Sequence, residues 1–133
     1  MPLELLSNSA PQGAVPMVLF SAGAFRAALE ARHVMSMSDQ PRASRYIEAA
    51  ALLFQHTAPA THWLTLNDTE GSWQLGVSHP VTLHSFAASE LHPLPPLLKA
   101  RRPHAALCGA TFEQQTLVLL LDAHLLTPQA TNS

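Results

Sequence analysis

The sequence predicts a mostly β fold with short helices, organised as a small closed β-barrel. Three short β-rich segments, THWLTL, SWQLGV and PVTLHSF, follow one another in residues 61–86, with turn-forming residues between them. A proline-punctuated loop, LHPLPPLLKARRP, then leads into a hairpin that joins ALCGATF to TLVLLLD. Several short strands separated by turn signals, ending in a strand that is apolar on both faces, are typical of a barrel and not of a helical or Rossmann-type domain.

Alternation with a period of two supports the strands of this half of the chain. Trp73, Leu75 and Val77 share one face, and polar residues or glycine occupy the other. Residues 67–71 are predicted to form a hairpin turn, because they end in a glycine that can adopt a positive φ. The last strand, residues 117–121, is apolar at every position. This pattern is expected where the barrel core covers one face and a second layer covers the other.

Individual side chains in this half also have predicted roles. Trp63 and Trp73, on adjacent strands, are expected to stack across the hairpin as part of the core. Asp122 leaves the last strand, where an aspartate commonly caps a following helix, here residues 123–126. Cys108 lies within a predicted strand, and a small buried thiol is its expected role.

The first half of the chain is more ambiguous. Residues 15–20, VPMVLF, form a β-rich run that is followed by a plausible tight turn. The next segment contains strong helix formers, yet residues 25–29 could equally form a strand that pairs back on the first run. Residues 44–55 carry apolar side chains at helical spacing and predict an amphipathic helix of about three turns.

A chain of 133 residues is long enough for one domain with a real core and too short for two. We expect a loosely held leader at residues 1–14, one domain at residues 15–127, and a short tail at residues 128–133. The leader lacks the features of a secretory signal, and no run approaches the roughly 18 apolar residues of a membrane span. A cytoplasmic protein without membrane contact is therefore expected.

Composition argues against several classes of function. The formal net charge is −2 and lysine occurs once, so the chain lacks the basic footprint of a nucleic-acid-binding protein. The eight histidines are scattered without the spacing of a metal site, and no nucleophile elbow or glycine-rich phosphate loop occurs. The acidic residues form no spaced catalytic pair. We therefore expect no metal, no cofactor and no enzymatic activity.

The low content of charged residues bears on association. Charged residues make up 12% of the chain, about half of what is usual in soluble domains. Such a surface tolerates contact, which is a mild indication of a buried partner interface or a homo-oligomer. A compact monomer with an uncharged polar surface explains the composition nearly as well.

Several motifs of the second half occur in the order and spacing of a known family. A glycine in the second strand of the hairpin, Gly76, is followed by a loop with Pro95 and Pro96, then by Gly109, and by a last strand ending in Leu-Asp before a short helix. Over roughly 65 residues this order resembles the C-terminal half of CheW-like domains, the adaptor modules of bacterial chemotaxis arrays. The resemblance implies a non-catalytic adaptor built from two small β-barrels.

The first half resembles the same family less closely. Residues 17–37 are similar to the opening hairpin of a CheW-like domain, which implies that residues 25–29 form a strand and that Val34 lies in another. Between Met37 and Trp63, however, the chain has only about 25 residues and lacks the glycine-rich stretch of the family. The first barrel is therefore expected to be shortened or incomplete, so its strand edges must be covered by a helix, a second copy or a partner.

Two functional hypotheses follow. The resemblance implies a protein partner, such as a chemotaxis-type histidine kinase, a receptor or another CheW-like domain, and a homodimer is possible. The alternative is a small-ligand-binding β-barrel module whose cavity lies at the barrel mouth, lined by Trp63, Trp73 and nearby histidines. The residues that flank the missing portion are the predicted partner-binding set: Val18, Phe20, Val34, Met37, Tyr46, Leu53 and Phe54.

Overall fold

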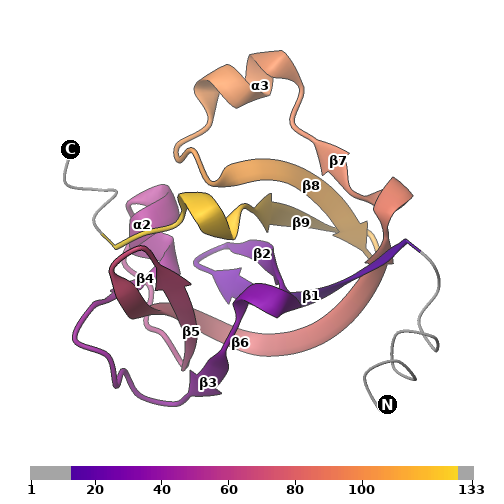
Figure 1. Cartoon of the computed structure of the whole chain (residues 1–133). Helices are drawn as coiled ribbons and strands as arrows, with labels where there is room; N and C mark the ends of the chain where they lie inside the picture. Colours follow the sequence, from indigo (N-terminus) through magenta and orange to yellow (C-terminus); the bar gives the residue numbers. More distant parts are fainter. Residues whose placement is uncertain (1–12, 129–133) are drawn as a thin grey trace, which may run out of the picture.

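The computed structural model describes residues 13–128, and strands dominate it as predicted (Figure 1). The strands are β1 (Ala14–Ala22), β2 (Phe25–Glu30), β3 (Ser36–Ser38), β4 (Tyr46–Glu48), β5 (His62–Asp68), β6 (Gly71–Ala87), β7 (His92–Pro93), β8 (Leu107–Glu113) and β9 (Thr116–Leu121). The helices are α2 (Ala49–Phe54) and α3 (Pro96–Arg101), with 3-10 turns η1 (Ala31–His33), η2 (Ala88–Glu90) and η3 (Ala123–Leu125).

The prediction of a closed barrel is wrong. The strands pair in the order β3-β5-β6-β1-β2-β9-β8-β7, with β4 on the side of β6, so the sheet ends at β3 and at β7. Both terminal strands are short, since β3 has three residues and β7 has two. The short segment after β3 supplies only β4, which pairs with β6, and α2, and these two elements do not close the sheet.

The long strand β6 connects two lobes (Figure 1). Its first half pairs with β5 and β4, and its second half pairs with β1. Side chains of β1 alternate between two buried clusters, since Leu19 belongs to one cluster and Phe20 to the other. In β9 Val118 and Leu120 join one cluster while Leu121 joins the other, which confirms a last strand that is covered on both faces.

The ambiguous segment after the first strand is a strand, as the resemblance implied. β2 pairs antiparallel with β1 and parallel with β9, so it has a hydrogen-bonded neighbour on each side. Ala27, Ala28 and Leu29 are fully buried, and this pairing and burial override their helix propensity. Val34 does not lie in a strand, which corrects the prediction, because η1 intervenes and β3 begins two residues later.

The predicted helix at residues 44–55 is only half correct. Residues Tyr46–Glu48 form β4, because the open edge of β6 offers backbone partners that a helix could not use. The helix α2 occupies the second half and buries Leu52 and Leu53. It ends at Gln55, which adopts a left-handed conformation with φ of 57°. The Gln55 amide donates to the Ala51 carbonyl and the His56 amide to the Ala50 carbonyl.

The two tryptophans do not stack on each other, contrary to prediction. Trp73 lies opposite Leu66 in the β5–β6 register, whereas Trp63 lies opposite Gly76. A Cβ at Gly76 would lie 2.8 Å from the Trp63 ring and 2.8 Å from the Ala60 Cβ. Glycine is therefore required here so that the indole can lie over the β6 backbone.

The C-terminal hairpin confirms the turn that the sequence predicts. Gln114 and Gln115 form the tip between β8 and β9, with φ of 50° and 73°. The Asp122 side chain accepts a hydrogen bond from the His124 amide at 2.9 Å and caps η3, as predicted. Cys108, expected to be buried, is exposed.

The proline-punctuated segment that was predicted to be a loop contains β7 and the helix α3. Most of the predicted leader at residues 1–14 lies outside the described residues, although Ala14 already belongs to β1. Of the predicted tail at residues 128–133, only Pro128 is described.

Candidate partner-binding groove

An apolar groove lies where the two lobes meet. It has a volume of about 290 Å³ and is lined by β1, β3, β5, β6 and the residue that follows η1. Its polar lining is limited to Ser36 and Thr82. The apolar lining consists of Val18, Val34, Met37, Leu64, Val81 and Leu83.

Strand pairing explains why these side chains converge. Val18 pairs with Leu83 across β1 and β6, while Met37 pairs with Leu64 across β3 and β5. Because β6 is shared by both lobes, the two pairs approach each other along one seam. Leu83 is 71% exposed and Met37 is 52% exposed, so a large apolar area on this seam remains in contact with water. Contiguous exposed apolar surface is a mark of an interaction site.

The edge of β3 adds backbone hydrogen-bonding groups next to the groove. Among residues 13–128, β3 pairs with β5 only, and it is the end of the strand order. An unpaired edge can accept a further strand from another polypeptide. Met35, immediately before β3, is 62% exposed but does not line the groove.

The loop between β3 and β4 is held against the first lobe by Gln74. This side chain is buried, and its carbonyl oxygen accepts hydrogen bonds from the Arg42 and Ala43 amides. Its amide nitrogen donates to Ser38 at 3.2 Å and to Thr65 at 3.1 Å. One satisfied buried amide therefore joins the loop to both strands beneath it, which supports the shortened lobe without the missing strands.

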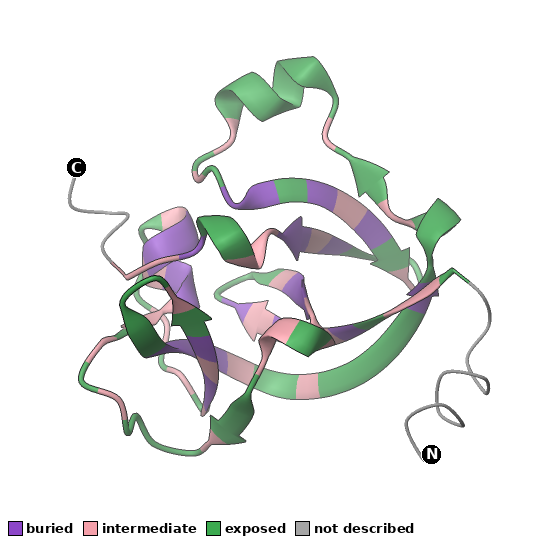
Figure 2. Cartoon of the chain, viewed as in Figure 1, coloured by how far each residue is buried: buried purple, intermediate pink, exposed green. Residues whose placement is uncertain are grey.

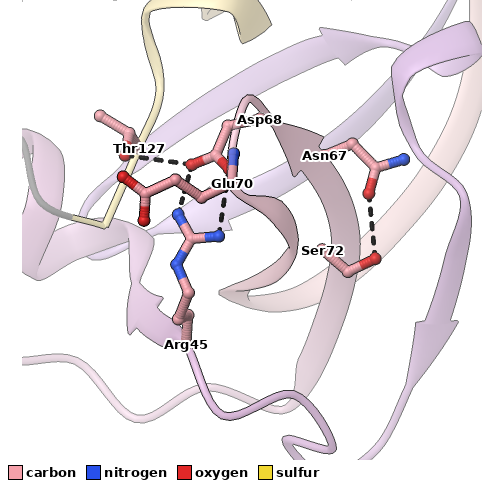
Figure 3. Close-up of polar contacts among 6 residues, drawn as sticks. All are labelled: Arg45, Asn67, Asp68, Glu70, Ser72 and Thr127. Carbon is pink, nitrogen blue, oxygen red and sulfur yellow. Dashed lines mark hydrogen bonds and ion pairs between the residues drawn. The ribbon is translucent and has the colours of Figure 1, made fainter.

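An ion pair fixes the other end of this loop (Figure 3). Arg45 donates two hydrogen bonds to the Asp68 carboxylate, one of them at 3.1 Å. The same carboxylate accepts from the Glu70 amide at 2.9 Å and from the Thr127 hydroxyl at 3.3 Å. The Arg45 hydrogen bonds are the main reason why the pKa of Asp68 lies below its ordinary value. The pair thus ties the loop, the β5–β6 turn and the C-terminal segment together.

The ion pair predicts a pH dependence of stability. Since the pKa of Asp68 is lower in the folded protein than in the unfolded chain, its carboxylate stabilises the fold above the ordinary pKa and loses that contribution as the pH falls below about 4. We expect Arg45→Met to lower the free energy of unfolding at pH 7 and to flatten its decline between about pH 4 and pH 2, as measured by urea denaturation.

The matched control for this prediction is Arg32→Met. Arg32 forms an exposed ion pair with Glu30 at 2.9 Å, and such surface pairs contribute little to stability. We expect this control to follow the wild-type curve at every pH. If the free energy of unfolding of Arg45→Met declined with pH as steeply as that of the wild type, the ion pair with Arg45 would not be what lowers the pKa of Asp68.

The fold was compared with known proteins. No protein-family model matches the sequence, and no curated protein matches it either. Twelve chains of solved structures match the fold, among them the scaffolding protein TtCheW from Thermoanaerobacter tengcongensis, with a TM-score of 0.67 and 10% sequence identity. The match covers 83% of this chain and 90% of TtCheW.

The chain has a CheW-like fold.

Two glycines that carry the sequence resemblance are required by this fold. Gly76 and Gly109 both occupy positions where the backbone is closely approached, by the Trp63 ring in one case and by the His92 carbonyl in the other. The coverage of 90% of TtCheW shows that the CheW-like fold is represented over nearly its whole length. The shortened segment after β3 therefore alters one lobe of the fold and does not remove it.

The CheW-like fold brings together three of the predicted partner-binding residues and separates the others. Val18, Val34 and Met37 line the groove. Phe20 and Leu53, however, are completely buried in the core, so they cannot contact a partner in this conformation and the prediction needs correction there. Neither residue could be assigned correctly from the sequence, because β1 and α2 carry apolar residues on more than one face.

Tyr46 and Phe54 lie outside the groove. Tyr46 is 53% exposed and packs edge-on against Trp63, with ring centroids 5.4 Å apart. Phe54 packs against Phe25 at 4.6 Å, beside a separate hollow of about 230 Å³ near the β1–β2 turn. Sequence reasoning did not single out Leu64, Val81 and Leu83, which lie within predicted strands and line the groove.

The alternative ligand-binding site does not form as expected. Trp63 and Trp73, which were to line a cavity at the barrel mouth, are both buried, and Trp73 belongs to the main core cluster. Within residues 13–128, no three His, Cys, Asp or Glu side chains are placed to hold a metal ion together. In the same part of the chain, no helix is both long and apolar enough to cross a membrane.

Proposed function

We propose that this chain is a non-catalytic adaptor of chemotaxis-type signal transduction, which binds another signalling protein through the groove between its lobes. The observation that carries the proposal is the exposed apolar seam of β1, β3 and β6 on a CheW-like fold. The expected partners are a chemotaxis-type histidine kinase, a receptor or another CheW-like domain. The protein that it resembles in fold is described as a scaffolding protein.

The chemistry of the groove suits a protein partner. Leu83 and Met37 are exposed on its two sides, and Ser36 and Thr82 are the polar residues among those that line it. Burial of such side chains provides most of the affinity at the centre of a protein interface, while polar contacts at the rim set its orientation. Methionine and leucine side chains can adjust to the shape of the partner, and the edge of β3 supplies backbone groups beside them.

Met37→Glu tests the proposal. A carboxylate placed in the apolar groove must be desolvated when the partner binds, so we expect the affinity for the partner to fall at least about tenfold. The stability of the free protein should change by less than about 0.5 kcal/mol, because Met37 is half exposed. The measurement is calorimetric titration with a kinase adaptor-binding domain or a receptor signalling fragment from the same organism.

Met35→Glu is the matched control. Met35 is two residues away and similarly exposed, but it does not line the groove. We expect this variant to keep wild-type affinity. Equal losses in both variants would indicate a nonspecific effect of charge, and wild-type binding by Met37→Glu would exclude the groove as the partner site.

A further inference from the structure

The helix α3 projects from the protein without packing against it. Figure 1 shows α3 away from the sheet, and every residue from Pro96 to Arg101 is exposed in Figure 2. Leu97 and Leu98 are 68% and 56% exposed. A helix of six residues is marginal in water unless tertiary contacts stabilise it. Two uncovered leucines on such a helix offer an apolar surface that a partner can cover.

The charge of α3 differs from that of the rest of the chain. Lys99, Arg101 and Arg102 are three of the seven basic residues, so the remainder carries four basic residues against nine acidic ones. Leu97 and Arg101 are four residues apart and share a helix face, which combines apolar and basic groups. Arg102 donates to the Leu107 carbonyl at 3.2 Å and holds the end of the helix in place. The expected binding surface is therefore apolar and acidic.

A hollow of that character lies on another side of the same molecule. It has a volume of about 430 Å³ and is bounded by the β5–β6 turn and by the segment around η3. Ala123 and Leu126 supply apolar lining, while Asp68 and Glu70 supply carboxylates. Asp68 is engaged by Arg45, so the exposed Glu70 is the carboxylate that an incoming cation would meet.

We propose that α3 of one copy docks into the hollow beside Glu70 of a second copy, with Leu97 or Leu98 on the apolar lining and Arg101 near Glu70. The basic helix and the acidic hollow are complementary in charge and both belong to this chain, which favours a second copy as the occupant. The contact is heterologous, so each copy retains one unused helix and one unused hollow, and association can propagate. This surface is distinct from the groove of the proposed function.

Reciprocal charge variants test the proposal. Arg101→Glu inactivates the helix and leaves the hollow intact, whereas Glu70→Arg does the reverse. In sedimentation velocity at concentrations up to about 1 mM, we expect the wild type to associate and each variant alone to associate at least tenfold more weakly. An equimolar mixture should associate again, because the intact helix of one variant meets the intact hollow of the other and the reversed charges of the second contact also attract each other. Arg32→Glu, an exposed charge change in η1, should associate like the wild type.

Three results would overturn the proposal: a wild type that stays monomeric throughout this range, variants that associate as the wild type does, or a mixture that remains monomeric. Vesicles of phosphatidylcholine with phosphatidylglycerol provide a further arm. Binding of a monomeric wild type to these vesicles, lost in Arg101→Glu, would assign α3 to an anionic lipid surface and would also overturn it.

Discussion

Replacing Phe20 with alanine is expected to lower the free energy of unfolding by about 3–5 kcal/mol. Phe20 is completely buried in the main core cluster, together with Leu53 and Trp73. Removing its ring leaves a cavity. Because β1 is hydrogen-bonded to β2 on one side and to β6 on the other, its backbone cannot move to fill that cavity. Most domains have a total stability of only about 5–15 kcal/mol, so the loss should be evident in urea denaturation.

The control for this substitution is Met37→Ala, on the exposed side of the groove. We expect it to change stability by less than about 0.5 kcal/mol. Together, the two variants distinguish a residue that stabilises the fold from a residue that is exposed to a partner. Both residues belong to the partner-binding set predicted from the sequence. A Phe20→Ala variant with wild-type stability and impaired partner binding would return Phe20 to the interface.

Gly109→Ala is expected to destabilise the fold by about 1–3 kcal/mol. A Cβ at this position would collide with the His92 carbonyl oxygen and would lie 3.2 Å from the Leu120 side chain. The collision is with backbone, and Pro93 pairs with Gly109 in the register of β7 and β8, so the strain cannot be relieved without separating these strands. Urea denaturation measures the overall loss.

Hydrogen exchange at one amide locates the effect of Gly109→Ala. The Leu94 amide donates to the Cys108 carbonyl at 3.2 Å, just beyond the β7 pairing. We expect this amide to lose more protection in the variant than the amides of β5, which lose only what the global destabilisation causes. Unchanged protection of Leu94 together with an unchanged denaturation midpoint would contradict the close approach of β7 to β8.

Local signals predicted the parts of the fold that depend on local interactions. The alternation around Trp73, the turn at Gln114 and Gln115, and the cap at Asp122 all involve residues within a few positions of one another. These features required no knowledge of distant partners. The same local signals predicted a helix for Tyr46–Glu48, but this segment forms a strand because it pairs with β6, which is distant in the sequence.

Features set by distant contacts could not be predicted in this way. Val34 was assigned to a strand, and only the first barrel was expected to be incomplete, whereas the sheet also ends at β7; neither outcome is determined by neighbouring residues. The sequence predicted part of the groove lining, because Val18 and Met37 were chosen as residues that flank the shortened segment. Leu83 was missed because an apolar residue within a β-rich run has the same pattern whether its face is covered or open.

The most direct test of the proposed adaptor role is an NMR titration of the labelled protein with a chemotaxis-type kinase or receptor fragment. Methyl groups of Val18, Val34, Met37 and Leu83 should shift or broaden on saturable binding, and those of Leu97 and Leu98 on α3 should not. No saturable binding to either class of fragment, or perturbations confined to surfaces away from the groove, would contradict a partner site between the two lobes.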